Sequence, residues 1–176
     1  MLRILLATVL SLSPMLAHAA GKFILSSPDI KAGAIMAGKY VYKGYGCSGG
    51  NLSPALSWQN APAGTKSFAL TVYDPDAKTG SGWWHWVVFN IPADTRSFAE
   101  GSVPTGAEQS RTDFGTPGYG GPCPPAGDRP HHYIFTIYAL KTGKLDLATD
   151  APAAMVGYMI NGNKIGQASF TALYGR

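Results

Sequence analysis

Charged side chains are scarce in this chain. Only 14% of its 176 residues are Asp, Glu, Lys or Arg, and the formal net charge is +4. Lys and Arg are scattered along the sequence and form no run or stripe. Because clustered basic side chains supply the electrostatic footprint of nucleic-acid binding, the sequence predicts no nucleic-acid partner.

Long apolar runs are also missing, except at the start of the chain. Arg3 precedes an apolar run from Ile4 to Leu16, which ends in the small-x-small sequence of Ala17 to Ala19. This order is typical of a cleaved signal peptide. The alternative is a membrane anchor, but a spanning helix needs about 20 predominantly apolar residues. We therefore expect residues 1–19 to be removed, leaving one domain at 20–176 without a transmembrane segment, in the periplasm or secreted.

Only two cysteines are present, Cys47 and Cys123. They lack the short paired spacing of a zinc-ligand set. In an exported chain an even pair favours a disulfide bond, so we predict a Cys47–Cys123 bridge. The alternative is two buried thiols, which pack as small hydrophobic side chains.

Familiar catalytic motifs are absent as well. The sequence contains no G-x-S-x-G elbow, P-loop, H-E-x-x-H helix motif or dinucleotide fingerprint. This favours a binding protein with no catalytic residue over an enzyme. A hydrolase of phosphoesters or esters remains the alternative, because an Asp and His cluster could activate water or hold a metal.

Glycine and proline, by contrast, are abundant, at 22 and 13 residues. This composition favours short strands joined by tight turns. Strands are predicted at Lys66 to Tyr73, Trp83 to Ile91, His132 to Leu140 and Gln167 to Leu173, and weaker ones at Lys22 to Leu25 and Lys39 to Tyr42. Pro152 and the helical spacing of the apolar residues after it predict one helix, ending near 161–163. The long Gly- and Pro-rich segment 102–130 is expected to be a functional loop. The fold class is mostly β, an antiparallel β-sandwich with one or two short helices.

Polar residues occur at the ends of three predicted strands. Asp74 ends the first, His85 lies near the start of the second, and His131 with Tyr133 begins the third. Strand alternation places each on the face of an apolar stripe, and in the second strand it groups His85 with Val87, Phe89 and Ile91, away from Trp84, Trp86 and Val88. Each residue alone has an ordinary structural role. Together they predict a pocket with an apolar body and a few convergent polar groups.

Six segments in this order resemble the phosphatidylethanolamine-binding protein family, bacterial Raf-kinase-inhibitor-like branch: Asn51 to Trp58, Tyr73 to Ala77, Trp83 to Pro92, Arg111 to Gly115, Gly118 to Pro125 and Pro130 to Tyr133. The resemblance implies a Greek-key β-sandwich with a shallow pocket for phosphate-type anions or phospholipid headgroups. No cofactor is expected. It also implies regulatory binding, with inhibition of a kinase- or protease-like partner as one form. By motif position, the implied ligand-binding residues are Asp74, Trp83, His85, Pro124, Pro125, His131 and Tyr133.

The chemistry of these residues suits an anion. His85, His131 and the Tyr133 hydroxyl can donate hydrogen bonds to phosphate oxygens. Asp74 would repel an anion, so we expect it to orient or protonate a histidine, with affinity falling as the pH rises through the histidine pKa near 6.5. Lys78 stands where the family motif has proline, and it adds a cation near the pocket.

Overall fold

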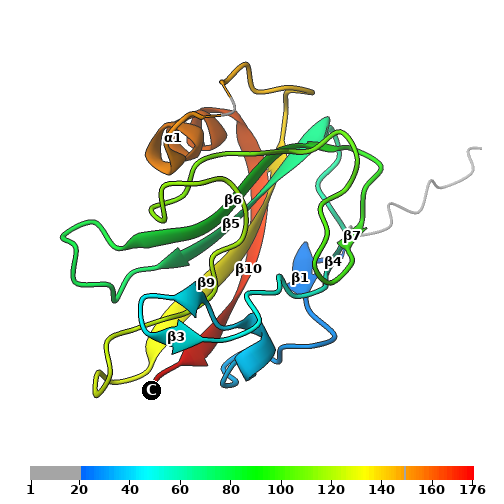
Figure 1. Ribbon diagram of the computed structural model, residues 1–176. Coiled ribbons are helices and arrows are strands. Elements are labelled where there is room, and N and C mark those ends of the chain that lie inside the picture. Colours follow the sequence, from blue (N-terminus) through cyan, green and yellow to red (C-terminus); the bar gives the residue numbers. More distant parts are fainter. Residues whose placement is uncertain (1–20, 149) are drawn as a thin grey trace, which may run out of the picture.

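The structure is a computed structural model that describes residues 21–148 and 150–176. The predicted signal peptide at 1–19 lies outside the described residues. The described part contains ten strands, one short 3-10 helix and one α-helix (Figure 1). The elements are β1 (Ile24–Ser26), η1 (Gly38–Tyr40), β2 (Lys43–Gly44), β3 (Cys47–Ser48), β4 (Leu56–Gln59), β5 (Ser67–Asp74), β6 (Trp83–Pro92), β7 (Ser97–Phe98), β8 (Glu108–Gln109), β9 (His131–Leu140), α1 (Ala153–Asn163) and β10 (Lys164–Tyr174).

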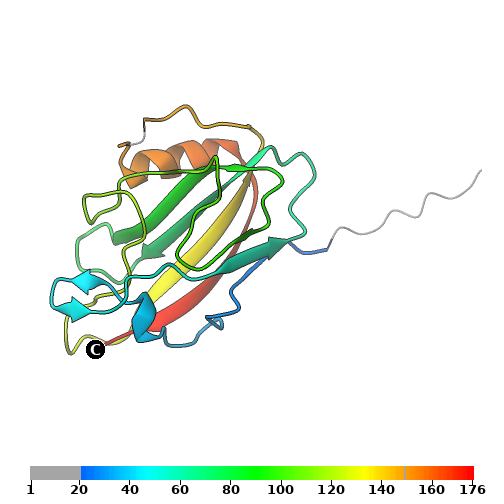
Figure 2. The same ribbon diagram turned by 45° about the vertical axis from the view of Figure 1, so that its right-hand side comes forward.

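Two antiparallel sheets form the body of the fold. The larger has the strand order β10-β9-β5-β6-β8, and the smaller has the order β1-β4-β7. The main hydrophobic core lies between them, with Leu25, Trp58 and Phe98 of the small sheet packed with Phe68 and Phe135 of the large one. Figure 2 shows the long strands as one curved layer. Helix α1 lies across the face of this layer that does not pack against the small sheet. The prediction of a mostly β, antiparallel sandwich is confirmed.

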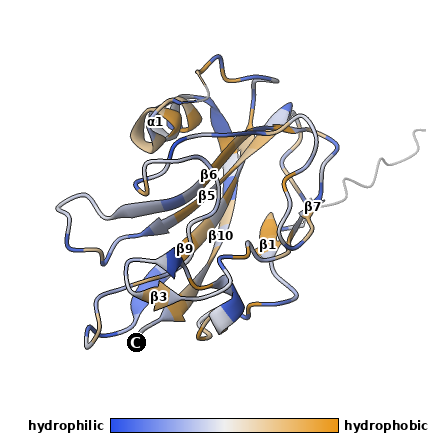
Figure 3. Ribbon diagram, viewed as in Figure 1, coloured by the Kyte–Doolittle hydropathy of each residue, from blue (hydrophilic) through white to orange (hydrophobic). Residues whose placement is uncertain are grey.

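Helix α1 covers the second face of the large sheet. Its buried residues, Ala153, Val156 and Ile160, recur at helical spacing and pack over Val87 and Phe89 of β6. The helix carries no charged residue and is mostly orange or pale in Figure 3. It begins after Pro152, as predicted, and leads directly into β10. Within the described residues, no helix is long and apolar enough to cross a membrane.

The four strong strand predictions are confirmed as β5, β6, β9 and β10, and β1 begins two residues later than its prediction. The predicted strand Lys39 to Tyr42 is wrong, because Gly38–Tyr40 forms the 3-10 helix η1. Lys39 and Tyr40 both direct their side chains to Glu100. Neighbouring residues of a strand point to opposite faces, so only a turn lets both reach one carboxylate.

The predicted side-chain alternation along β6 is also wrong. The register with β5 slips twice, once between Trp84 and Trp86 and once between Val88 and Ile91. Each slip is a bulge, which adds a residue and reverses the alternation. His85 therefore lies on the core side with Trp86 and Tyr133, while Val87 faces the helix layer. The second slip restores the original alternation, so Ile91 again faces the main core.

Candidate functional site

A cavity of about 280 Å³ opens where β5 ends and where β6 and β9 begin. All seven residues predicted for the pocket line it: Asp74, Trp83, His85, Pro124, Pro125, His131 and Tyr133. A larger hollow of about 440 Å³ lies beside η1, but the buried polar side-chain atoms that lack a partner are not on its walls. The smaller cavity is the better candidate because Trp83 and Tyr133, which line it, each have a buried polar atom without a partner among the described residues. Whether it binds a ligand is still a prediction.

His131 is held by Asp74 on the floor of the cavity. Both side chains are almost fully buried, and Nδ1 of His131 lies 2.7 Å from Oδ2 of Asp74. The other carboxylate oxygen accepts a hydrogen bond of 2.8 Å from the backbone N–H of Asp76. A carboxylate fixed in this way sets the orientation and the tautomer of its histidine. This geometry agrees with the orienting role expected for Asp74.

His85 differs from the sequence-based interpretation. Its Nδ1 lies 2.7 Å from the backbone oxygen of Gly120, so in the neutral ring the proton is on Nδ1 and Nε2 is an acceptor. Burial lowers the pKa of His85 from 6.5 to about 4. At neutral pH His85 is therefore uncharged and accepts a hydrogen bond. The prediction that it donates to an anion is wrong at this pH, because burial outweighs the nearby Asp74 carboxylate.

Two donors in the cavity have no partner among the described residues. They are the indole Nε1 of Trp83 and the hydroxyl of Tyr133, and both atoms are buried. Burial, followed by the charge of Asp74, raises the pKa of Tyr133, so its hydroxyl keeps its proton. A buried donor without an acceptor costs roughly 1–3 kcal/mol. A ligand oxygen that accepts from such a donor would remove its cost.

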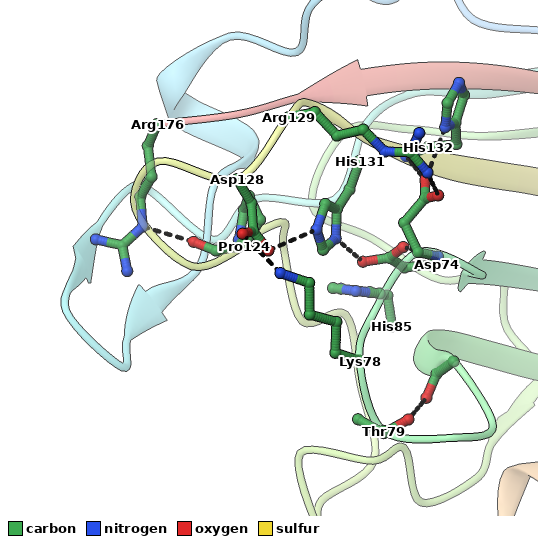
Figure 4. Close-up of polar contacts among 12 residues, drawn as sticks. Asp74, Lys78, Thr79, His85, Pro124, Asp128, Arg129, His131, His132 and Arg176 are labelled. Atoms are coloured by element: carbon green, nitrogen blue, oxygen red, sulfur yellow. Dashed lines mark hydrogen bonds and ion pairs between the residues drawn. The ribbon is translucent and has the colours of Figure 1, made fainter.

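A chain of charged groups runs from Lys78 on the cavity wall through Asp128 to His131 (Figure 4). Nζ of Lys78 lies 2.8 Å from Oδ1 of Asp128, and Oδ2 of Asp128 lies 3.5 Å from Nε2 of His131. Lys78 lowers the pKa of Asp128, which is therefore ionised at neutral pH. Sequence reasoning noticed Lys78 but missed Asp128, which lies in the turn of a Pro- and Gly-rich loop with no periodic signal.

The aromatic side chains of Phe114 and Tyr45 form part of the cavity wall, and sequence reasoning missed them. Phe114 packs edge to face with Trp83 and His85, at centroid distances of 5.4 and 5.3 Å. Tyr45 stacks against Phe114 at 6.0 Å. Tyr45 comes from the β2–β3 hairpin and Phe114 from the long loop 102–130, and neither segment has a strand or helix pattern that would place them. This loop thus contributes to the site, as its length suggested.

The predicted disulfide is present between Cys47 and Cys123, whose Cα atoms are 6.0 Å apart. It joins β3 to the loop that supplies Pro124 and Pro125, and Cys123 itself lines the cavity. Among the described residues, no group of three or more His, Cys, Asp or Glu side chains is arranged to hold a metal ion.

The family model for phosphatidylethanolamine-binding protein matches residues 26–175. The chain belongs to this family. It is 50% identical to the UPF0098 protein YbcL of Escherichia coli, over 97% of both chains. It is 47% identical to the UPF0098 protein YbhB of the same organism, over 85% of this chain and 98% of that one.

Solved structures of the phosphatidylethanolamine-binding family agree with the fold. The crystal structure of E. coli YbcL superposes with a TM-score of 0.87, covering 89% of this chain and 99% of that one. A homologue from Chlamydia trachomatis, 30% identical, gives a TM-score of 0.76 and covers 88% of this chain and 97% of that one. The likeness therefore extends over the whole sandwich.

Proposed function

We propose that this protein is an exported binding protein whose pocket takes a small phosphate-type oxyanion, either free or as the headgroup of a phospholipid. The observation that carries the proposal is the pair of buried donors, Trp83 Nε1–H and the Tyr133 hydroxyl, which share one cavity and lack acceptors among the described residues. Inhibition of a kinase- or protease-like partner enters the proposal through the family resemblance alone.

The remaining walls fit this ligand class. His85 offers an acceptor at Nε2, which suits a ligand hydroxyl or a protonated phosphate oxygen. Phe114, Pro124 and Pro125 give the cavity an apolar rim that could contact the organic part of a phosphate ester. A phosphate group carries both oxygens for the two donors and, when protonated, a hydrogen for His85.

Export is supported by three observations. Residues 1–19 have the order of a signal peptide, and a disulfide bond such as Cys47–Cys123 persists in oxidising compartments. A relative that is 38% identical over 74% of this chain is a putative lipoprotein, LppC, of Mycobacterium tuberculosis.

The proposal is tested with a pair of tyrosine variants. In Tyr133→Phe the hydroxyl inside the cavity is removed, so affinity for inorganic phosphate should fall by about tenfold while stability is unchanged or improved. Tyr119→Phe is the matched control. The Tyr119 hydroxyl donates to the backbone oxygen of Tyr40 over 3.0 Å and is not on the wall of this cavity, so its loss should lower stability but not affinity. Isothermal titration and urea unfolding measure the two effects.

Two results would contradict the proposal. One is an absence of binding by any phosphate-type anion, including phospholipid headgroups, to the intact protein. The other is equal affinity in the wild type and Tyr133→Phe. Hydrolysis of phosphoesters or esters that disappears in His85→Ala would instead support the hydrolase alternative.

A further inference from the structure

The cavity contains very little uncompensated positive charge. Lys78 is the one Lys or Arg on its wall among the described residues, and its ammonium group is already paired with Asp128 at 2.8 Å. His85 is neutral because burial lowers its pKa to about 4. His131 lies between the carboxylates of Asp74 and Asp128. Even with His131 protonated, two cations face two carboxylates, so the charges of the site cancel at best.

Asp128 is placed in this position by a fixed turn. Its backbone N–H donates to the oxygen of Pro125 over 3.2 Å, and Gly127 between them has a φ of 85°, which favours glycine. Gly127 N–H donates to the oxygen of Arg176 over 2.9 Å, and Nε of Arg176 donates to the oxygen of Pro124 over 2.7 Å. These bonds tie the turn to Arg176, just after β10, so the Asp128 carboxylate is held beside the cavity.

The charge of Asp128 is only partly neutralised. Lys78 pairs with Oδ1, but Lys78 is largely exposed, and its side chain has 75% of its surface accessible. Oδ2 is buried and has no hydrogen-bond donor among the described residues. It lies 3.5 Å from Nε2 of His131, on the side of the ring opposite Asp74. An anion bound near His131 would therefore lie close to a carboxylate whose inner oxygen accepts no hydrogen bond from the described residues.

We propose that Asp128 makes the pocket select singly charged oxyanions, such as phosphodiesters, over doubly charged ones, such as phosphomonoesters. This inference rests on the proposed function of the pocket as an oxyanion site. Repulsion grows in proportion to the charge of the ligand, whereas the neutral donors of Trp83 and Tyr133 serve either ligand. A dianion thus suffers twice the repulsion from Asp128, while the attraction of the exposed Lys78 ammonium, which also doubles, is screened by solvent.

The test compares two small ligands that differ by one charge. At pH 8 methyl phosphate carries two negative charges, since its second pKa is about 6, whereas dimethyl phosphate carries one. The wild type should bind dimethyl phosphate more tightly. In Asp128→Asn the affinity for methyl phosphate should rise by about tenfold and that for dimethyl phosphate by only about threefold, so that the preference weakens or reverses. Isothermal titration gives both dissociation constants.

Two further variants separate this role from a general change of charge or structure. Asp128→Glu retains the carboxylate and should keep the preference for the monoanion. Asp94→Asn removes one negative charge from an exposed turn next to Pro92, at the end of β6 far from the cavity, and should leave the ratio of the two affinities unchanged. The preference is therefore expected to follow the carboxylate at position 128.

The outcomes distinguish this inference from the proposed function. If the wild type binds both ligands but favours methyl phosphate, or if Asp128→Asn improves both affinities equally, the selective role of Asp128 is wrong and the oxyanion pocket stands. If neither the wild type nor any variant binds either ligand, the proposed function fails, and this inference fails with it.

Discussion

Burial determines what His85 does in the cavity. The unfolded chain binds a proton on this side chain near pH 6.5, but the folded protein does so only near pH 4. The stability contributed by the neutral ring is therefore fully present above pH 6.5 and is lost as the pH falls through this window. One pKa unit corresponds to about 1.4 kcal/mol, so lowering the pH should reduce the free energy of unfolding by about 3 kcal/mol.

Urea unfolding across this pH window checks the prediction. The control is His85→Asn, whose amide can still donate to Gly120 but does not titrate, and which should lose much less stability as the pH falls. Equal losses in the two proteins would show that other groups cause the effect. The same lowered pKa means that phosphate affinity should not depend on protonation of His85 at neutral pH, contrary to the expectation from its unperturbed pKa.

Part of the site could be predicted from the types of its residues. The protonation and hydrogen bonding of each side chain depended on its surroundings in the fold. Asp74 was expected to orient or protonate a histidine because a carboxylate would otherwise repel an anion, and the structure places it 2.7 Å from His131. The protonation of His85 depends on the depth at which it is buried and on the carbonyl of Gly120, which belongs to an irregular loop. Neither can be derived from strand periodicity.

At the scale of single elements, Asn90 explains one of the two bulges in β6. It has a φ of 55°, in the left-handed region. Its side chain accepts from the N–H of Leu145 over 2.7 Å and donates to the oxygen of Leu145 over 3.2 Å. It also donates to Glu108 of β8 over 2.9 Å. One amide thus connects β6 with β8 and with the segment that follows β9.

Replacing Asn90 should therefore be costly. Asn90→Ala leaves buried backbone groups of Leu145 without partners and places an alanine in the left-handed region, so unfolding should become easier by about 2–4 kcal/mol. Asn90→Gly loses the same hydrogen bonds but tolerates the backbone angle, and it should be less destabilised by about 1 kcal/mol. Urea unfolding of both variants gives the comparison. Equal stability of the two would mean that the backbone angle carries no cost.

Elements with a strong pattern were predictable, and those built by turns were not. The long strands β5, β6, β9 and β10 are rich in β-branched and aromatic residues, which is the signal that strand prediction requires. The bulges of β6 carry no such signal, because an inserted residue looks like any other in the sequence. The 3-10 helix η1 was missed because its side chains contact a distant residue, Glu100, which lies 60 residues after Tyr40.

At the scale of the molecule, the disulfide connects residues separated by 76 positions. Closing a loop of this length stabilises a fold by roughly 4 kcal/mol on the loop-entropy model. With the proposed export, mature protein recovered from the periplasmic fraction should begin at Ala20 and show no free thiol after denaturation without reductant. Mass spectrometry and thiol titration check both points. An intact N-terminus or two free thiols would contradict the respective half of the prediction.

The overall fold was the most predictable level. Composition and strand patterns together indicated a mostly β sandwich, because many weak signals along the chain agreed on this fold class. The family resemblance added the topology. The positions of Tyr45, Phe114 and Asp128 were not predictable. They depend on the paths of Gly- and Pro-rich loops, where local sequence specifies turns but not the direction of the chain between them.

The strand order has a consequence for the time course of folding. Strand β10 pairs along the whole of β9, and its Leu173 and Thr171 also exchange backbone hydrogen bonds with the segment 33–36 near the start of the domain. Contacts between such distant positions form slowly, and they cannot form before both partners have been synthesised. We therefore expect the large sheet to be completed only after β10 has left the ribosome. Under the proposed export, a chain whose sheet is still incomplete can be threaded through a membrane pore.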